Sequence, residues 1–364
     1  MRVPFFNYQR QLKKIQPEID LAIKRVLNSG QLILGREVKN FENNFSRYLG
    51  VKYGVGVNSG TDALKIALRA LGVGPGHEVI TVSNTAVPTV SAIREVGAMP
   101  KLVDIKENYT IDETKIVKAI TKKTKAIIAV HLYGQPCNMP AILKIAKKYK
   151  LKVIEDCCQA HGAKINGRAV GAFGHIGCFS FYPTKNLGAY GDGGMILTNN
   201  KNLAATCRAL RMYGMKEGYH SEIEGYNSRL DEIQAGILNV KLKYLDKWNE
   251  RRKAIAGYYL KNIKNQKIIL AKIDKNISSS FHLFVIRTAN RRKLEKYLKA
   301  SGIGYGIHYP YPVHCQPAYK FLNYKPGNLP RTEKFAEQIL SLPIFPELTD
   351  SELKYIVQKL NNWK

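Results

Sequence analysis

Lys185 has the most distinctive surroundings of any side chain that could do chemistry. It stands in SFYPTKNLGAYGDGG (residues 180–194), between an aromatic run and a glycine-rich stretch that leads into a strand-like MILTN. Glycines at such a place let the backbone come close to a flat or bulky group. Taken alone, Lys185 is interpreted first as a solvated loop lysine. Phosphate binding and covalent attachment of a cofactor are the alternatives that the segment leaves open.

Asp156 ends the apolar run KVIED in KVIEDCCQAHG (residues 152–162). The run is typical of a buried strand, and open α/β sheets bind ligands beyond the carboxyl ends of such strands. A carboxylate there needs a partner, because burying an unpaired charge is costly. An ion pair or a helix cap is the simpler interpretation, and a bound ligand is the other.

The segment NSGTDALKIALRAL (residues 58–71) predicts a helix that begins at Thr61 or Asp62, after a strand and a glycine-containing turn. The first N–H groups of a helix lack partners within it and the helix dipole is positive there, so this place suits an anion. A helix capped by Ser59 or Thr61 is the simpler interpretation. The chain has no GxxxxGK[ST] motif and no complete GxGxxG motif.

The three segments together fit the needs of one cofactor, pyridoxal 5′-phosphate. Its phosphate needs a helix N-terminus and a hydroxyl, and Ser180 offers the hydroxyl. Its pyridine nitrogen needs a carboxylate that keeps it protonated, and its aldehyde needs a lysine amine. The combination of Asp156, Lys185 and the helix start therefore predicts a site for this cofactor.

We expect no metal site. Cys157 and Cys158 are adjacent in sequence, which is a poor spacing for chelation, although His161 follows them closely. No CxxC pair occurs, so we expect free thiols in a reducing compartment. The six cysteines are Cys137, Cys157, Cys158, Cys178, Cys207 and Cys315.

The elements that must position these residues follow a βαβ rhythm. From about residue 50 to residue 200, strand-like runs alternate with amphipathic helical runs, which predicts an α/β domain with a mostly parallel sheet between helices. A long helical stretch from near Ser228 is expected to bridge to a smaller α+β domain. We expect a large domain over residues 1–245 and a small one over 246–364, with the first fifteen or so residues packed on the small domain. TDSE predicts a capping box of Thr349 with Glu352.

The bulk composition restricts the class of protein. The 364 residues carry a formal net charge of +29, but the lysines and arginines are scattered over predicted helix faces and no nucleic-acid motif occurs. We therefore expect no nucleic-acid partner, and the charge suits an anionic small substrate. No apolar run reaches the length of a membrane span, and the start lacks a signal-peptide pattern, so we expect a cytoplasmic protein.

The motifs resemble the DegT/DnrJ/StrS family of sugar aminotransferases over nearly the whole chain. They are NSGTDAL, EDCCQAHGA, FSFYPTKNLGAYGDGG, GYNSRLDEIQA and IHYPYPVHCQPAY. The resemblance implies the type I fold of pyridoxal-phosphate-dependent transferases. It also implies transfer of an amino group from an amino acid, with L-glutamate expected, to a keto-deoxysugar on a nucleoside diphosphate, for surface polysaccharide or glycoconjugate synthesis.

The resemblance implies a role for each matched residue around the cofactor. Lys185 forms the Schiff base, Asp156 pairs with the pyridine nitrogen, and Gln159 contacts the ring or its 3-hydroxyl. The phosphate is held by three residues: Gly60, Thr61 and Ser180.

The same resemblance implies a homodimer with active sites shared between subunits, because Asn227 is expected to reach the phosphate of the neighbouring subunit. His308 and Tyr309 resemble a sugar-facing loop. At Ala86 the sequence departs from many relatives, which carry there an aromatic side chain that stacks on the ring. The stacking partner is therefore left open.

The loop HYPYPVHCQPAY resembles relatives that act on 3-keto sugars more than the HYI-type loop of some 4-keto enzymes. We therefore expect a product of the dTDP-3-amino-3,6-dideoxyhexose type, with a 4-keto nucleotide-sugar as the alternative substrate. A sugar dehydratase with the same cofactor is less favoured, because some of these carry histidine where Lys185 stands. A non-catalytic regulator is disfavoured because Lys185, Asp156, Gln159 and Ser180 are all present.

Overall fold

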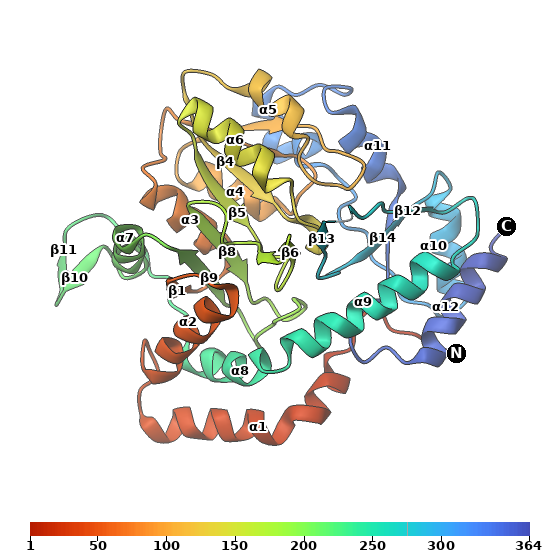
Figure 1. The fold of residues 1–364 in the computed structure, drawn as a ribbon, viewed down its shortest axis with the longest axis horizontal. Coiled ribbons are helices and arrows are strands. Elements are labelled where there is room, and N and C mark those ends of the chain that lie inside the picture. The colour runs from red at the N-terminus through yellow and green to blue at the C-terminus, as the bar shows by residue number, and fades with distance from the viewer. Residues whose placement is uncertain (275) are drawn as a thin grey trace.

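A computed structural model describes residues 1–274 and 276–364, apart from the side chains of residues 216 and 217. Its centre is a seven-stranded sheet in the order β1-β9-β8-β5-β4-β2-β3 (Figure 1). The strands are β1 (Tyr53–Val57), β2 (Glu78–Val82), β3 (Met99–Val103), β4 (Thr124–Val130), β5 (Lys152–Asp156), β8 (Ile176–Ser180) and β9 (Gly194–Thr198). Only β9 pairs antiparallel with its neighbours in this sheet. The expected α/β fold with a mostly parallel sheet is confirmed.

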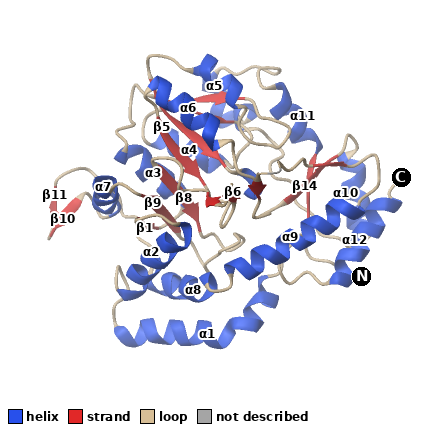
Figure 2. Cartoon of the chain, viewed as in Figure 1, coloured by secondary structure: helices blue, strands red, loops and turns tan. Residues whose placement is uncertain are grey.

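Helices cover the sheet on both faces (Figure 2). They are α2 (Arg36–Leu49), α3 (Gly60–Ala70), α4 (Val87–Glu95), α5 (Glu113–Ala119), α6 (Met139–Tyr149), α7 (Lys201–Arg211) and α8 (Glu232–Leu242). α3 packs against α4 and α7, α5 against α6, and α2 against β1 and α8. In α3, Ala63, Leu64 and Ala67 recur at helical spacing and are fully buried, which fixes the direction in which its N-terminus points.

The C-terminal part has its own sheet and its own apolar core. Its antiparallel strands β12 (Ile269–Leu270), β14 (Phe284–Arg287) and β15 (Ile339–Leu342) pack with α9 (Leu245–Asn262), α10 (Arg291–Ala300) and α12 (Asp350–Asn362). The predicted capping box at the start of α12 is confirmed, since Thr349 and Glu352 bond to each other's backbone N–H groups. The remaining elements are α11 (Pro330–Gln338), β6 (Lys164–Ile165), β7 (Arg168–Ala169), β10 (Met215–Glu217), β11 (His220–Ser221), β13 (Ile277–Ser278), and the 3-10 turns Leu132–Gly134, Val313–Cys315 and Pro317–Leu322.

The N-terminal residues lie on this C-terminal part. Val3 forms a parallel bridge with Ile303, and the Phe6 ring meets the Phe345 ring edge-on. The guanidinium of Arg10, in the first turn of α1 (Tyr8–Ser29), pairs with Glu352 at 2.7 Å. The rest of α1 then runs back along α8 (Figure 1).

The helical stretch after Ser228 is two helices rather than the single long one that its sequence predicts. α8 and α9 are separated at residues 243–244. Tyr244 is held there by tertiary contacts, because its hydroxyl donates a hydrogen bond to Glu18 on α1 and its ring stacks on Trp248. Among the described residues, no helix is both long and apolar enough to cross a membrane.

Glu155 organises the loop that follows β5. Its carboxylate is fully buried, and its two oxygens accept hydrogen bonds from the backbone N–H groups of Gly171, Phe173 and Gly174 at 2.7–2.8 Å. The same carboxylate lies 3.1 Å from Nε2 of His131. Glu155 therefore ties residues 171–174 to the sheet, directly beside Asp156.

His131, Glu155 and Cys157 bring three potential metal-ligating atoms within 4.8 Å of one another. However, Nδ1 of His131 accepts a hydrogen bond from the N–H of Cys137, so its proton lies on Nε2, which donates to Glu155. Since Glu155 also accepts from three backbone groups, hydrogen bonds already account for this cluster.

We predict that Glu155→Gln destabilises the protein by about 3 kcal/mol, because an amide nitrogen cannot accept from the buried N–H groups that one carboxylate oxygen now serves. The free energy of urea unfolding of the cofactor-free protein measures this. Glu337→Gln, on the exposed side of α11, is the control and should change it by less than about 0.5 kcal/mol. Equal stability of the two variants would contradict the assigned role of Glu155.

Candidate active site

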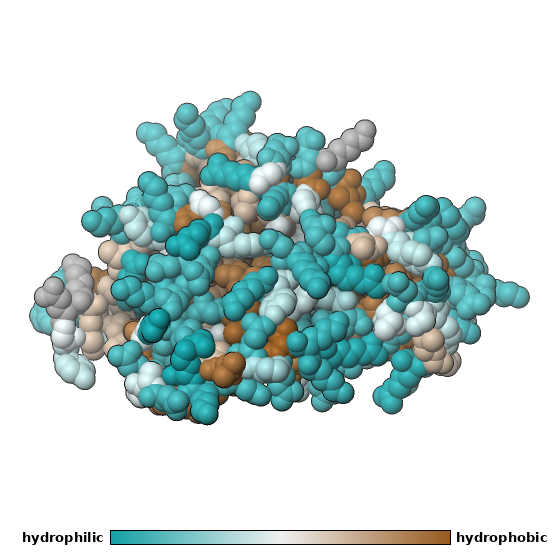
Figure 3. Space-filling model, turned by 60° about the horizontal axis from the view of Figure 1, so that its bottom comes forward, coloured by the Kyte–Doolittle hydropathy of each residue, from teal (hydrophilic) through white to brown (hydrophobic). Residues whose placement is uncertain are grey.

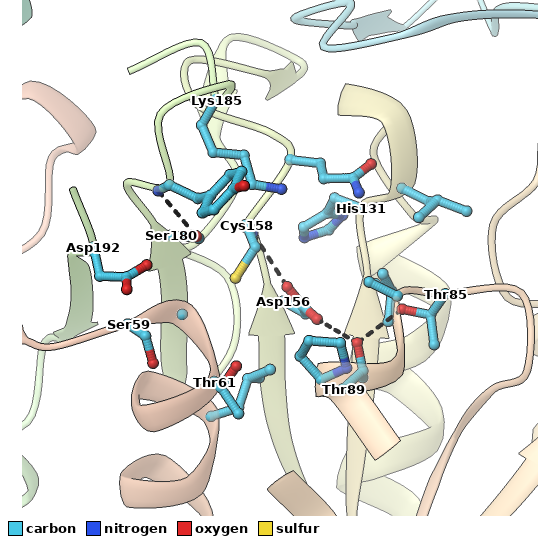
Figure 4. Close-up of a pocket in the computed structure, with 18 residues that line it drawn as sticks. Ser59, Thr61, Thr85, Thr89, His131, Asp156, Cys158, Ser180, Lys185 and Asp192 are labelled. Atoms are coloured by element: carbon cyan, nitrogen blue, oxygen red, sulfur yellow. Dashed lines mark hydrogen bonds between the residues drawn. The ribbon is translucent and has the colours of Figure 1, made fainter. Parts of the chain in front are cut away.

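A pocket of about 210 Å³ lies where the carboxyl ends of several parallel strands meet (Figure 4). Residues that directly follow β1, β2, β4, β5 and β8 line it, because parallel strands deliver their ends to one edge of the sheet. Its lining includes six of the residues that the sequence singles out: Gly60, Thr61, Asp156, Gln159, Ser180 and Lys185. The structure therefore brings together residues up to 125 positions apart in the chain, from Gly60 to Lys185.

Lys185 enters the pocket from the loop between β8 and β9 (Figure 4). Its backbone N–H donates to the carbonyl of Tyr182 at 2.9 Å, which fixes the turn that carries it. Within the described part of the chain, no hydrogen bond or ion pair engages its amine. Burial lowers the pKa of Lys185 below the ordinary lysine value, although the charges of Cys158 and Asp156 oppose that shift. The amine is thus less basic than that of a surface lysine.

Asp156 is held rigidly at the end of β5. One oxygen accepts from the Thr89 hydroxyl at 2.8 Å and the other from the N–H of Cys158 at 3.2 Å. The Thr89 hydroxyl in turn lies 2.8 Å from that of Thr85. The sequence analysis missed both threonines, and only their position in NTAVPT, close to Ala86, could have indicated them. Asp156 is 5% exposed and has no cationic partner at ion-pair distance among the described residues, so it faces the pocket as a carboxylate prepared for one.

The start of α3 forms an anion-binding corner. Ser59 is the N-cap, and its hydroxyl accepts from the N–H of Asp62 at 3.1 Å. The N–H groups of Gly60 and Thr61 have no acceptor among the described residues, as expected for the first turn of a helix. A Cβ atom on Gly60 would lie 2.7 Å from the Cβ of Ser180, so only glycine allows the helix to approach β8 this closely. The Ser180 hydroxyl thereby comes beside the free N–H groups.

Gln159 links the pocket to the C-terminal part of the chain. Its side-chain oxygen accepts from the backbone N–H of Tyr133 at 2.8 Å, and its amide nitrogen donates to the Tyr309 hydroxyl at 3.0 Å. The Tyr133 hydroxyl donates to the carbonyl of His308. His308 and Tyr309 do not line this first pocket, but they line a second cavity that Lys185 also lines. Tyr133 was not singled out by the sequence.

Ala86 lines the pocket directly before the first turn of α4. No aromatic ring can come from this position. The ring-bearing side chains that line the pocket are those of Pro88, His131 and Tyr182. The structure therefore confirms the place of Ala86 at the pocket but does not single out one stacking residue.

Asn227 does not line the pocket of its own chain. It is exposed and forms a backbone bridge with Met212, next to the hairpin of β10 and β11. Its neighbour Ser228 accepts from the N–H of Asn58 at 3.1 Å and donates to Asp62 at 2.8 Å, which anchors the segment beside the start of α3.

The pocket fits pyridoxal phosphate by the chemistry of its donors. One wall offers an amine without a partner, another a buried carboxylate, and the third two free helix N–H groups with a hydroxyl. These are the partners that the aldehyde, the pyridine nitrogen and the phosphate need. The close approach of α3 to β8 in this corner depends on the missing side chain of Gly60.

Comparison with known proteins agrees with this geometry. The chain is 46% identical to a "Pleiotropic regulatory protein" of Geobacillus stearothermophilus, over 99% of this chain and 98% of that protein. It is 47% identical to the dTDP-3-amino-3,6-dideoxy-alpha-D-galactopyranose transaminase of Aneurinibacillus thermoaerophilus, over 99% of each. The crystal structure of S. venezuelae DesV in complex with a ketimine intermediate matches with a TM-score of 0.98 at 44% identity, covering 100% of this chain and 98% of that one.

Other matching structures hold pyridoxamine phosphate or are in the pyridoxal phosphate form. The model of the DegT/DnrJ/EryC1/StrS aminotransferase family matches residues 13–361. Fold, pocket chemistry and sequence similarity thus lead to one conclusion: the chain belongs to the DegT/DnrJ/EryC1/StrS aminotransferase family.

Proposed function

We propose that this protein transfers an amino group from an amino acid, with L-glutamate as the expected donor, to a keto-deoxysugar linked to a nucleoside diphosphate. The observation that carries the proposal is the meeting of Lys185, Asp156 and the free N–H groups of α3 in one pocket. Relatives named as sugar transaminases, at 43–47% identity, support the substrate class. One relative is named as a regulator, but that name describes no feature of this pocket. The pocket's full set of reactive groups favours an enzyme.

Lys185 is proposed as the residue that holds and moves the proton. Bound pyridoxal phosphate supplies an aldehyde carbon that links to amines and a ring that takes up electrons. With the cofactor bound, the free amine of Lys185 would accept the proton from the donor's Cα. Burial lowers the pKa of Lys185 below the ordinary lysine value, which is the direction that favours a general base.

Asp156 is proposed to hold the pyridine nitrogen in its protonated form. Thr89 and the N–H of Cys158 already bond to its two oxygens and hold the side chain in place. Gln159 is proposed to contact the ring. Its hydrogen bond to Tyr309 would then connect the ring to the proposed sugar-facing loop. Gly60, Thr61 and Ser180 are proposed to hold the phosphate, because two helix N–H groups without acceptors and a hydroxyl line the same corner of the pocket.

A 3-keto sugar is the proposed acceptor, with the dTDP-3-amino-3,6-dideoxyhexose type as the product and polysaccharide or glycoconjugate synthesis as its use. Support comes from relatives named for 3-amino sugars bound to dTDP. His308 and Tyr309 line the cavity beside Lys185, where a sugar would meet the amine. The net charge of +29 suits an anionic nucleotide-sugar, and we propose that the protein acts in the cytoplasm.

A homodimer with shared sites is proposed on two observations. Asn227 is exposed in the single chain, beside the start of α3. Four large apolar side chains on and after α1 are also between 47% and 63% exposed: Leu21, Leu27, Leu32 and Ile33. Figure 3 brings that side of the molecule forward and shows apolar patches on a largely hydrophilic surface. A second copy would cover such side chains.

We predict that purified protein loaded with the cofactor has a visible absorption band that borohydride bleaches. The reduction should leave the cofactor covalently attached to Lys185 as a label. Lys185→Ala should lose the covalent label and reduce turnover by at least about a hundredfold, because the general base is gone. The label is measured by peptide mass and turnover by product formation. Lys201→Ala, at the exposed start of α7, should behave as the wild type. Full turnover without Lys185 would overturn the proposal.

The lowered pKa of Lys185 predicts the pH dependence of cofactor uptake. A lower pKa means that more of the amine is unprotonated at a given pH, so cofactor-free protein should bind the aldehyde with a midpoint below the ordinary lysine pKa of about 10.4. Absorbance after mixing with pyridoxal phosphate gives the rate at each pH, and Nα-acetyl-lysine serves as the reference amine. A midpoint equal to that of the reference would show that burial does not tune this lysine.

Substrate choice is tested with a panel of 3-keto and 4-keto sugars on dTDP and UDP, in the presence of glutamate. We expect the mass change of ketone to amine for the dTDP-linked 3-keto sugar, at a kcat/KM at least about tenfold above that of the 4-keto sugar. Conversion of the 4-keto sugar alone would establish the alternative. Conversion of neither, together with salt-sensitive binding to DNA, would favour a regulator instead.

A further inference from the structure

One face of α8 contacts the turn between β8 and β9, residues 181–193, which carries the reacting lysine. Gln234 and Lys241 stand seven residues apart on α8, which is about two helical turns, so both side chains lie on this face. The side-chain oxygen of Gln234 accepts a hydrogen bond from the N–H of Tyr190 at 2.9 Å. The amine of Lys241 donates one to the carbonyl of Gly188. α8 therefore holds the second half of the turn at two backbone positions.

Gly188 packs against the first half of the same turn. A Cβ atom on Gly188 would lie 2.4 Å from the carbonyl oxygen of Pro183 and 2.9 Å from that of Tyr182. The Tyr182 oxygen is also the acceptor for the backbone N–H of Lys185, at 2.9 Å. A shift of Gly188 therefore moves the carbonyl group that fixes the backbone of Lys185. From this backbone the lysine side chain reaches into the pocket (Figure 4).

The carbonyl of Gly188 depends on Lys241 for its hydrogen bond. Among the described residues, no other donor reaches this carbonyl, and no carboxylate lies at ion-pair distance from the Lys241 amine. Both residues are buried, so water does not replace either partner. A buried carbonyl without a donor costs free energy, and this bond therefore keeps Gly188 against α8.

Burying the Lys241 amine is costly in itself. Lys241 is 2% exposed, and burial lowers its pKa to about 7, although the charge of Glu347 opposes that shift. Its nitrogen lies 4.6 Å from the centre of the Tyr190 ring, which adds a cation–π contact. An apolar side chain would fill the same place without the cost of a buried charge. Packing alone therefore does not account for a lysine at this position.

We propose that Lys241 is a positioning residue: by holding the Gly188 carbonyl, it fixes the turn and thereby directs the amine of Lys185 into the pocket. The inference rests on the proposed aminotransferase function and adds a residue that determines where its reacting group lies. Lys241 lines neither of the two cavities beside Lys185, so it acts through the backbone of the turn. Placement matters because proton transfer needs the base within hydrogen-bond reach of the atom that it deprotonates.

The basicity of Lys185 separates this role from a purely structural one. If Lys241 served stability alone, its replacement would lower the free energy of unfolding and leave the Lys185 amine of the folded protein unchanged. If Lys241 positions the turn, the Lys185 amine loses its buried surroundings, and burial is what lowers its pKa. The charge of Lys241 is not among those that act on the pKa of Lys185, so removing that charge does not imitate the effect.

The first test uses cofactor-free protein and trace labelling with acetic anhydride, which reacts with unprotonated amines. The labelled fraction of Lys185 at each pH, measured by peptide mass, gives the midpoint of its titration, with exposed Lys201 of the same sample as the reference. Lys241→Met replaces the amine by an unbranched apolar side chain. In this variant the Lys185 midpoint should lie at a pH at least about 0.5 above that of the wild type, toward the ordinary lysine value.

The second test follows cofactor-loaded protein through a single turnover with glutamate. In Lys241→Met the rate constant at saturation should fall at least about tenfold, while the glutamate concentration that gives half of that rate changes less than about threefold. The reason is that the reacting amine is displaced, whereas the groups that bind the substrate stay in place.

Lys243→Met is the matched control. Lys243 follows α8 directly, and its exposed amine pairs with Glu18 on α1 at 3.3 Å. This variant should behave as the wild type in both tests. If Lys241→Met does not fold, Lys241→Gln decides by the same two measurements, because its donor is neutral and one atom closer to the backbone. Urea unfolding of each variant establishes that it is folded under the assay conditions.

The outcomes separate this proposal from the proposed function. If the replaced Lys241 leaves the Lys185 midpoint as in the wild type, the positioning role is wrong, whether or not the rate falls, and the aminotransferase function stands. If the wild type shows no spectral change with any amino acid, the aminotransferase function itself fails. The labelling of Lys185 then still decides whether Lys241 positions that amine.

Discussion

The reversal of the chain between β8 and β9 is the constraint on which the site depends. β9 is antiparallel to β8 and next to it, so the chain must turn back at the carboxyl edge of the sheet, where Asp156 ends β5. This turn, residues 181–193, is folded tightly on itself: a Cβ on Gly188 would lie 2.4 Å from the carbonyl oxygen of Pro183. A Cβ on Gly194 would lie 2.3 Å from that of Ser59. Both positions therefore require glycine, and the tight turn places Lys185 over the carboxyl edge of the sheet.

The packing at this edge also sets the electrostatics of the pocket, because it leaves charged side chains without ion-pair partners. Lys185 and Asp156 carry opposite charges, but they line the pocket without forming an ion pair. Burying two such groups costs free energy that a ligand giving each a partner would offset. The hydrogen bonds that position them come from residues outside the reaction, such as Thr89 for Asp156. The fold thus fixes the geometry of both groups while it leaves their chemistry free for the ligand.

Sequence and structure agree where function follows from local pattern and differ where it depends on distant contacts. The strand end at Asp156 and the helix start at Gly60 are local features, because apolar runs and caps mark them in the sequence. Thr89 bonds to Asp156, 67 positions further along the chain, and no spacing in the sequence reveals such a pair. The break between α8 and α9 has the same origin, since contacts with α1 hold Tyr244 there.

The two cavities beside Lys185 have different walls: the first lies at the edge of the seven-stranded sheet, and the second includes residues of the C-terminal part. Lys185 lines both, so a group on either side meets the same amine. Gln159 and Tyr309 bond across the boundary between them, which couples the cofactor pocket to the sugar-facing loop. The backbone N–H of Tyr133 holds the oxygen of the same amide, so Gln159 fixes the Tyr309 hydroxyl relative to the first pocket. The boundary between the two cavities is therefore set by hydrogen bonds between the edge of the seven-stranded sheet and the C-terminal part of the chain.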